Sequence, residues 1–453
     1  MIVVKFGGTS VGDAAAIERA AAITRSRVNQ KPVVVVSALG GVTNALLAIA
    51  EQATRGQLIG ALRGVESLRE RHMRESDALL GAGEVADDVK GELSAMTDEL
   101  ASLAEALSVL GHLTPRSLDA IAAKGEQMSS ALIVAAFRQR GVAADHVDAR
   151  EVMITDDEYT RAAPRIDAIA KAARAVLQPI VRSNRVPVMG GYIGATEQGI
   201  TTTLGRGGSD FSAALVGAAM GAKAIEIWTD VDGMLTADPR VVKGARLIEE
   251  IRFDEAAELA SFGAKVLHPS TIAPAVQRGI PVFIYNSRNP DGKGTRITSS
   301  GPPRAVTAIA GKSGITIIKV RSSRMLLAFG FLRTLFEIFE RHKTSVDVVA
   351  TSEVSVSVTV DDPSRLDALL VDLRALGDVS VERNRAIVAI VGASLGAHSE
   401  AMGCALRALG DIPLHMLSLS ATEINLTIII DEERLAPAIR ALHDEFFAPG
   451  EST

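Results

Sequence analysis

A glycine-rich turn near the middle of the chain constrains its fold more than any other feature. Residues 201–211 read Thr-Thr-Thr-Leu-Gly-Arg-Gly-Gly-Ser-Asp-Phe and lead into a run of small apolar residues. Glycines let the backbone turn tightly and approach a ligand closely. Ser209 or Asp210 can cap the helix that follows, whose free N–H groups attract anions, and Arg206 adds a cation suited to carboxylate or phosphate. An ordinary surface turn fits the same pattern, so the rest of the chain must decide between them.

Composition narrows the class of protein. The 453 residues provide for two or three domains and a large core. Lys and Arg (48) against Asp and Glu (54) give a net charge of −6 without a basic stripe, so we expect no nucleic-acid partner. Hydrophobic content of 47% with 4% aromatic residues suits a tightly packed α/β protein. Cys404 is the one cysteine, which excludes a disulfide framework and a thiolate metal cluster.

The sequence indicates a cytoplasmic protein with no membrane partner. The apolar start at residues 2–6 is too short for a signal peptide. No segment has the roughly 18 uncharged apolar residues that a membrane-spanning helix needs.

Glycine turns also follow the first two predicted strands. Residues 2–6 read as a buried strand that runs into Gly7 and Gly8, with Asp13 capping the next helix. Residues 32–36 repeat the pattern, followed by Ser-Ala-Leu-Gly-Gly-Val-Thr-Asn. This is the layout of a phosphate site at the carboxyl ends of parallel strands. Neither the dinucleotide fingerprint nor the P-loop is present, and Gly-Lys-Ser at 311–313 lacks the earlier glycine of a P-loop.

The chain alternates between strands and helices up to about residue 300. Residues 55–115 read as a helical insertion broken near Gly81 and Gly83. Further strands at 186–189 and 225–228 alternate with helices, which predicts a mainly parallel sheet covered on both faces.

The last third contains an internal repeat. Ser-Glu-Val-Ser-Val-Ser-Val-Thr-Val-Asp at 352–361 recurs 70 residues later as Thr-Glu-Ile-Asn-Leu-Thr-Ile-Ile-Ile-Asp at 422–431. Each copy reads as an alternating strand followed by a helix, and each follows a strand–helix–strand pattern whose first strand we expect at 315–320 and at 386–391. We therefore predict two βαββαβ modules in tandem, suited to ligand sensing or to self-association through edge strands.

Four motifs together resemble the aspartate kinase family: residues 4–11, 204–210, 229–233 and 262–269. The resemblance covers essentially the whole chain and implies an amino-acid-kinase domain at 1–300. Two ACT domains would follow at 305–383 and 384–453, with strands that can exchange or interlock. The implied reaction is phosphorylation of the L-aspartate side chain by ATP, the first step toward lysine, threonine, methionine and diaminopimelate. The resemblance is to a monofunctional, lysine-sensitive type.

The resemblance also implies roles for individual residues. Lys5 would lie on the transferring phosphoryl group, with Asp210 holding it in place. Arg206 would clamp the substrate α-carboxylate and Glu126 would receive the ammonium, although the first turn of a helix favours a carboxylate in any case. The rest of the substrate site would be Thr43, Gly207, Gly208 and Ser209. The ATP site would comprise Lys5, Phe6, Gly7, Gly8, Ser37, Thr229, Asp230, Leu235, Arg240, Lys265 and Val266.

This chemistry explains why no catalytic histidine or Ser–His pair is evident. The nucleophile is a carboxylate, already ionised at neutral pH, so no general base is required. Catalysis would rest on positioning and on cations that oppose phosphate charge. The cofactor would be ATP with Mg²⁺, which phosphate oxygens and water would hold, so no protein ligand for a metal is assigned. Leu235 replaces an aromatic residue of many relatives, which removes ring stacking on adenine.

The first ACT module resembles the lysine-inhibited type. The implied effector residues are Met325, Phe331, Ser345, Val346, Asp347, Ser352 and Glu353. Asp347 would receive an effector amino group, whereas residues 327–329 are more apolar than in some lysine-sensitive members. Lysine is the expected effector, with threonine or no effector as alternatives. Such modules favour a homodimer or homotetramer.

Two other functions compete with this interpretation. A kinase of the same fold could act on glutamate, acetylglutamate or a nucleotide, but the tandem ACT repeat and residues 262–265 argue against it. A catalytically inactive amino-acid sensor could keep the fold, but intact Lys5, Arg206 and Asp210 argue against that.

Overall fold

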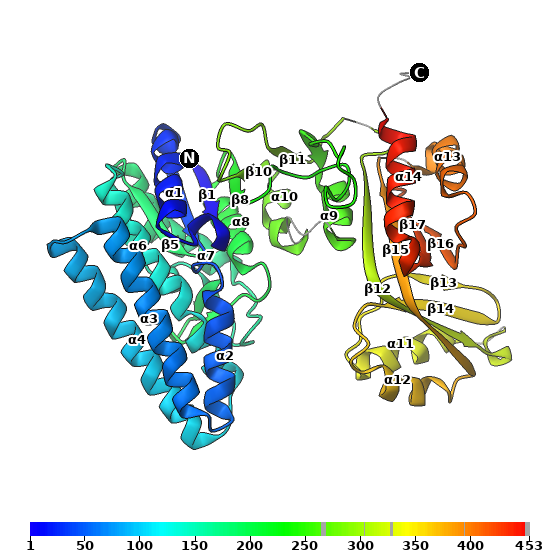
Figure 1. Cartoon of the computed structure of the whole chain (residues 1–453), viewed down its shortest axis with the longest axis horizontal. Coiled ribbons are helices and arrows are strands. Elements are labelled where there is room, and N and C mark those ends of the chain that lie inside the picture. Colours follow the sequence, from blue (N-terminus) through cyan, green and yellow to red (C-terminus); the bar gives the residue numbers. More distant parts are fainter. Residues whose placement is uncertain (264–268, 303, 327–328, 394, 449–453) are drawn as a thin grey trace. The chain divides into compact units, whose positions relative to one another are not determined.

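The computed structural model describes residues 1–263, 269–302, 304–326, 329–393 and 395–448. The chain forms two compact units, one of residues 1–234 with 266–301 and one of residues 235–265 with 302–453. Each unit contains both strands and helices (Figure 1). No helix among the described residues is long and apolar enough to cross a membrane.

A mainly parallel sheet forms the centre of the first unit, as predicted. β1 (Ile2–Phe6) pairs in parallel with β2 (Pro32–Val36) and with β8 (Ile225–Thr229). These strands are rich in β-branched residues and almost wholly buried, because helices cover both faces of a parallel sheet. Within this unit the strand order is β3 (Ala144–Val147), β5 (Val186–Gly190), β2, β1, β8, β10 (Val282–Asn286) and β11 (Thr295–Thr298), with the last pair antiparallel.

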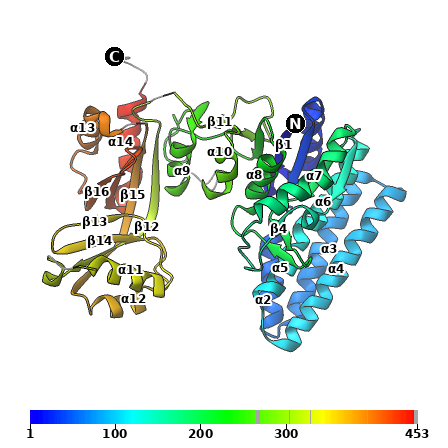
Figure 2. The ribbon, with the colours of Figure 1, turned by 180° about the vertical axis from the view of Figure 1, so that it is seen from behind.

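Helices complete the first unit, and the predicted helical insertion is confirmed as the hairpin of α3 and α4 (Figures 1 and 2). Asp13 caps α1 as predicted, with Oδ1 2.8 Å from the N–H nitrogen of Ala16. The helices are α1 (Ala14–Arg27), α2 (Val42–Thr54), α3 (Leu58–Leu80), α4 (Glu84–Leu110), α5 (Pro115–Ala122), α6 (Lys124–Gln139), α7 (Ile166–Arg182), α8 (Gly208–Met220) and α10 (Ala273–Gln277).

A small second sheet leads the chain into the glycine-rich turn. It consists of β4 (Ile154–Thr155), β6 (Ile193–Thr196) and β7 (Thr201–Thr203), in that order. The three threonines are therefore a strand, and the turn links β7 to α8. Neither Ser209 nor Asp210 caps α8: Gly207 is the N-cap, with φ of 72°. A left-handed conformation of this kind is strained for residues with a Cβ, which explains the glycine.

The second unit contains one antiparallel sheet in which both copies of the repeat take part. The strand order is β13 (Val349–Thr351), β14 (Ser355–Val360), β12 (Ala308–Arg321), β15 (Asp378–Val391), β17 (Asn425–Asp431) and β16 (Met416–Leu419). The repeated strands are β14 and β17, and α12 (Leu366–Leu373) and α14 (Leu435–Phe447) follow them as predicted. The predicted strand at 315–320 is longer than expected, because β12 also includes the Gly-Lys-Ser segment at 311–313.

Two apolar clusters stabilise the two halves of this sheet. α11 (Phe331–Arg341) and α12 pack against β12 and β14 around Leu335 and Leu369. α13 (Ser399–Leu409) and α14 pack against β15 and β17 around Leu409 and Leu442 (Figure 2). Residues 235–263 add β9 (Glu250–Arg252) and α9 (Phe253–Ser261) to this unit.

Candidate active site

Lys5 and Asp210 meet inside the first unit. Lys5 lies in β1 and is 7% exposed, while Asp210 lies in the first turn of α8. The Lys5 Nζ is 2.7 Å from Asp210 Oδ1, and the two side chains are 9% and 14% exposed. An ion pair with this little solvent keeps both side chains in a single arrangement, because either charge without its partner would be costly there.

Close backbone contacts explain the glycines on both sides of this pair. A Cβ on Gly8 would lie 3.1 Å from the carbonyl oxygen of Ala38. A Cβ on Gly208 would lie 2.7 Å from Cδ2 of Tyr192 and 3.0 Å from its Cα. Gly205, with φ of 77°, has the second left-handed conformation of the turn. The turn therefore needs glycine for its geometry, and it directs the N-terminus of α8 toward a site where an anion is favoured.

A cavity of about 660 Å³ lies between these elements. Its walls come from β1, the loop after β2, α2, α5, α6 and the glycine-rich turn. The structure brings together there ten of the residues predicted for the site: Lys5, Gly8, Ser37, Thr43, Glu126, Arg206, Gly207, Gly208, Ser209 and Asp210.

Glu126 is the most perturbed carboxyl group of this cavity. It lies in the first turn of α6 and is 3% exposed. Burial raises its pKa to about 8, and hydrogen bonds from the backbone of Ala38 and of Glu126 itself offset this only in part. Its Oε2 has no hydrogen-bond partner among the described residues. A helix-dipole role does not require such burial, whereas a perturbed carboxyl group in a cleft is typical of a functional site.

Asp119 is a cavity residue that sequence reasoning missed. It is 1% exposed and accepts hydrogen bonds from the N–H of Thr160 (2.9 Å), the N–H of Thr203 (3.0 Å) and the hydroxyl of Thr203 (2.7 Å). Burial raises its pKa, and these hydrogen bonds oppose that rise. Asp119 thereby ties α5 to the end of β7, directly before the glycine-rich turn. No local spacing could have indicated this, because its partners are 41 and 84 residues away.

Other residues predicted for the ATP site do not line the main cavity. Phe6 is fully buried, so its side chain belongs to the core, and the N–H of Gly7 donates to the carbonyl of Trp228 at 3.0 Å. Thr229 and Asp230 lie where β8 ends, with 3.3 Å between the Thr229 hydroxyl and the Asp230 carboxylate.

The remaining ATP-site residues belong to the second unit or are not described. Leu235 bridges to Leu247, and Arg240 pairs with Asp238 at 2.6 Å while its side chain stays 86% exposed. Lys265 and Val266 lie outside the described residues. Within the described ranges, no three His, Cys, Asp or Glu side chains are placed to hold a metal ion.

The predicted effector residues lie in one half of the second unit. Met325, Phe331 and Val346 pack against the apolar cluster beneath α11 and α12. Ser345 and Asp347 flank Val346 in the loop before β13, whereas Ser352 and Glu353 form the turn between β13 and β14.

Asp347 already has a partner in this structure. Lys312 of β12 places its Nζ 3.4 Å from Asp347 and 2.7 Å from Asp361. Burial and the nearby Asp361 raise the pKa of Asp347, while Lys312 opposes that rise. Lys312 belongs to the Gly-Lys-Ser segment at 311–313, and nothing in its local sequence indicates these two ion pairs.

Comparison with known proteins identifies the family. Residues 1–286 match the Amino acid kinase family, and residues 388–446 match an ACT domain. The chain is 38% identical to lysine-sensitive aspartokinase 3 of Escherichia coli (strain K12), over 99% of both chains. The chain belongs to the aspartokinase family. This aspartokinase is also 35% identical to the chloroplastic aspartokinase 3 of Arabidopsis thaliana, over 98% of this chain and 81% of that protein.

Solved structures confirm the fold of this aspartokinase. Crystal structures of E. coli aspartokinase III superpose with a TM-score of 0.84 for the complex with lysine and aspartate (T-state), at 38% identity over 99% of both chains. The TM-score is 0.85 for the complex with aspartate and ADP (R-state), at 37% identity over 99% of this chain and 100% of that one. The predicted combination of an amino-acid-kinase fold with ACT modules is therefore correct.

Proposed function

We propose that this aspartokinase transfers the γ-phosphoryl group of ATP to the side-chain carboxylate of L-aspartate, giving 4-phospho-L-aspartate and ADP. A carboxylate oxygen forms the new bond to phosphorus, and the bond from phosphorus to the β,γ-bridging oxygen breaks. The proposal rests on the Lys5–Asp210 ion pair, which places one cation in a cavity that also contains Arg206 and Glu126. The E. coli relative has been solved with aspartate and ADP.

Catalysis in this proposal is electrostatic. The attacking carboxylate is ionised at neutral pH, so no group has to remove a proton from it. Lys5 opposes the negative charge of the transferring phosphoryl group, and Asp210 holds the Lys5 ammonium in place. Preorganised charges of this kind lower the barrier because they need no rearrangement during the reaction.

Two charged residues would select the amino-acid substrate. Arg206 would bind the α-carboxylate with its guanidinium fork, and Glu126 would accept the α-ammonium. The unpartnered Oε2 of Glu126 supports this role, because a bound ammonium would supply the missing donor. Thr43, Gly207, Gly208 and Ser209 would complete the substrate site from α2 and the glycine-rich turn.

ATP would bind beside this site as its Mg²⁺ complex. The first unit would contribute Lys5, Phe6, Gly7, Gly8, Ser37, Thr229 and Asp230, mainly at strand ends. Leu235, Arg240, Lys265 and Val266 stay predictions that rest on the family resemblance alone. Since the described residues offer no cluster of three metal-ligating side chains, we assign the Mg²⁺ to phosphate oxygens and water rather than to the protein.

Feedback inhibition by lysine is the regulation we propose. The E. coli relative is named lysine-sensitive and has been solved with lysine. In this chain Met325, Phe331 and Val346 pack against the apolar cluster beneath α11 and α12. Val346 directly precedes Asp347, the acceptor we assign to an effector amino group. We further propose domains at 1–300, 305–383 and 384–453, a homodimer or homotetramer, and a cytoplasmic location.

Release of ADP with different acceptors tests the reaction. The purified chain should release ADP with L-aspartate and far more slowly with glutamate or acetylglutamate. A preference for either of the other acceptors would replace the proposed substrate. No turnover with any acceptor would favour an inactive amino-acid sensor.

A further inference from the structure

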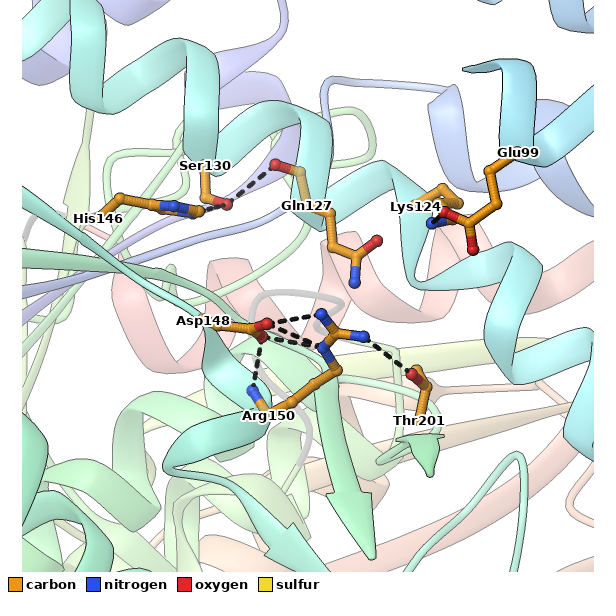
Figure 3. A network of polar contacts seen from close by, with 8 residues as sticks. All are labelled: Glu99, Lys124, Gln127, Ser130, His146, Asp148, Arg150 and Thr201. Atoms are coloured by element: carbon orange, nitrogen blue, oxygen red, sulfur yellow. Dashed lines mark hydrogen bonds and ion pairs between the residues drawn. The ribbon is translucent and has the colours of Figure 1, made fainter. Parts of the chain in front are cut away.

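A second, smaller cavity lies along α6 in the first unit. Its volume is about 250 Å³, and the polar side chains that line it are drawn in Figure 3. α6 contributes Lys124, Gln127 and Ser130. The segment that begins in β3 contributes His146, Asp148 and Arg150, and Glu99 of α4 completes the polar lining. The main cavity shares none of these residues.

Lys124 is a buried cation with an exposed partner. Its side chain is 9% exposed, whereas that of Glu99, whose Oε2 lies 2.5 Å from Lys124 Nζ, is 62% exposed. An ammonium group has three N–H donors, and this contact uses one of them. The cation is therefore fixed in the cavity wall, and its exposed carboxylate partner can turn toward solvent when another anion takes its place on the ammonium.

Arg150 is held in a fixed orientation on the opposite wall. Its Nε and Nη2 both donate to Asp148, and its Nη1 lies 3.4 Å from the hydroxyl of Thr201. Burial raises the pKa of Asp148, but its hydrogen bonds with Arg150 outweigh burial and keep the pKa below its usual value. Asp148 thus stays ionised and already satisfies Arg150.

Gln127 lies between the two ion pairs (Figure 3). Its side-chain amide makes no hydrogen bond among the described residues, although its backbone carbonyl accepts one from Ser130. His146 pairs with Ser130 at 3.0 Å, and burial lowers the pKa of His146, so the ring is neutral near pH 7. The donors left free around the cavity are thus the Lys124 ammonium and the Gln127 amide.

We propose that this cavity binds a small oxyanion, a carboxylate or a phosphate ion, with Lys124 as its main cation. The anion would replace Glu99 on the buried ammonium and would accept a further hydrogen bond from Gln127. With Glu99 turned to solvent, the charged side chains that line the cavity, Lys124 and Arg150 against Asp148, sum to one positive charge, while Glu92 and Glu151 lie outside the lining. The volume corresponds to about eight water molecules at roughly 30 Å³ each, enough for such an ion with bridging water.

The position of the cavity links it to Glu126. Lys124 and Gln127 flank Glu126 in the first turn of α6. Gly190 lines the small cavity, and a Cβ there would lie 3.0 Å from the Cβ of Glu126. A bound anion would therefore alter the packing of this turn and change the KM for aspartate. That effect on KM rests on the proposed role of Glu126, whereas anion binding does not.

Calorimetric titration of the full chain with sodium phosphate, and separately with sodium acetate, at constant ionic strength tests the site. Lys124→Gln should weaken binding about tenfold or more, the usual worth of a charged hydrogen bond. Glu99→Gln should strengthen it, because the competing carboxylate is removed. Lys90→Gln removes a comparable ion pair between α4 and α3 outside the cavity and should change nothing. Whichever anion gives the Lys124-dependent signal identifies the ligand class.

The variant Arg206→Ala distinguishes anion binding in the main cavity from anion binding in the smaller cavity. The signal that depends on Lys124 should persist in that variant. The proposal is wrong if Arg206→Ala removes all anion binding while neither Lys124→Gln nor Glu99→Gln changes it. In that case the second site does not exist, and the proposed reaction is unaffected. Should Lys124→Gln fail to fold, Gln127→Ala and Glu99→Gln still decide, because weaker binding in the first and tighter binding in the second are both required.

Discussion

Lys5 of β1 and Asp210 of α8 form an ion pair with 2.7 Å between Nζ and Oδ1, in a cavity where both side chains are largely shielded from solvent. Neither residue has another charged partner in the described ion pairs, so each depends on the other for its position. We predict that Lys5→Ala and Asp210→Ala each lower kcat by about 100-fold or more, the scale expected for removing a preorganised electrostatic contact.

The variant Asp210→Asn tests whether turnover depends on the charge of Asp210 or only on its shape. It should also lose most turnover, because the amide cannot neutralise Lys5. Arg185→Ala breaks an exposed ion pair with Asp145 in the same unit and should leave kcat nearly unchanged. Circular dichroism would verify that each variant is folded. Near-normal kcat in a folded Lys5 or Asp210 variant would remove these residues from the mechanism.

Because the pKa of Glu126 is raised, we expect Glu126→Gln to have opposite effects on stability and on substrate binding. Its pKa of about 8 in the folded chain lies above the unfolded value, so the folded state holds its proton while the unfolded state releases it. The resulting stability is therefore present at low pH and is lost as pH rises from about 4.5 to about 8. We predict that Glu126→Gln increases the free energy of unfolding at pH 7 by on the order of 2 kcal/mol, measured by urea titration.

The same substitution should impair aspartate binding. An ionised Glu126 can accept the substrate ammonium, whereas an uncharged glutamine offers a weaker acceptor. We predict that KM for aspartate falls between pH 6 and pH 8 in the unmodified chain, as Glu126 loses its proton. In Glu126→Gln the KM for aspartate should not change with pH over that range, and at pH 8 it should be about tenfold higher or more than in the unmodified chain. A parallel pH profile in both proteins would show that another group controls binding.

Asp119 should act on substrate binding through the turn that carries Arg206. Asp119→Ala leaves the N–H groups of Thr160 and Thr203 without their acceptor, which we expect to cost about 2–3 kcal/mol of stability. KM for aspartate should rise more than kcat falls, because Arg206 is displaced while Lys5 and Asp210 remain paired. Thr203→Val is the matched control: it removes the hydroxyl bond to Asp119 but keeps both backbone donors on that carboxylate, and it should have a smaller effect on both quantities.

Local patterns were sufficient for the parts of the site that follow a strand end. The glycines near Lys5 and the turn around Arg206 came from short motifs, whereas the role of Glu126 was implied only by the family resemblance. The structure brings all of them to one cavity. The capping residue of α8 was predicted wrongly, because a hydroxyl or carboxylate normally caps a helix. Here the left-handed backbone at Gly207 takes that position.

Contacts between distant segments could not be predicted in the same way. Asp119 is fixed by backbone groups far along the chain, and Lys312 meets Asp347 only because β12 extends beyond its predicted start. Strand pairing in the second unit depends on which of the segments with alternating apolar and polar residues form hydrogen bonds with one another. That choice is made by packing of the whole sheet rather than by any one strand.

Lys312 and Asp347 give a test of effector binding with two opposite outcomes. If the amino group of lysine binds Asp347, it competes with the Lys312 ammonium for this carboxylate. Lys312→Gln should then lower the lysine concentration needed for half-inhibition by about threefold or more, since one competing charged contact is removed. Asp347→Ala should raise that concentration and leave the uninhibited rate unchanged, because Asp347 lies in the second unit and outside the main cavity.

Initial rates measured against lysine and, separately, threonine provide the comparison. Lys319→Gln is a suitable control, because Lys319 lies on β12 like Lys312 but pairs with Glu382 of β15 rather than with a predicted effector residue. A response to threonine alone would keep the regulatory role of the second unit and change the effector. If lysine changes the initial rate of neither the unmodified chain nor Lys312→Gln, lysine is excluded as the effector. In Lys312→Gln the carboxylate of Asp347 no longer has the competing ammonium of Lys312.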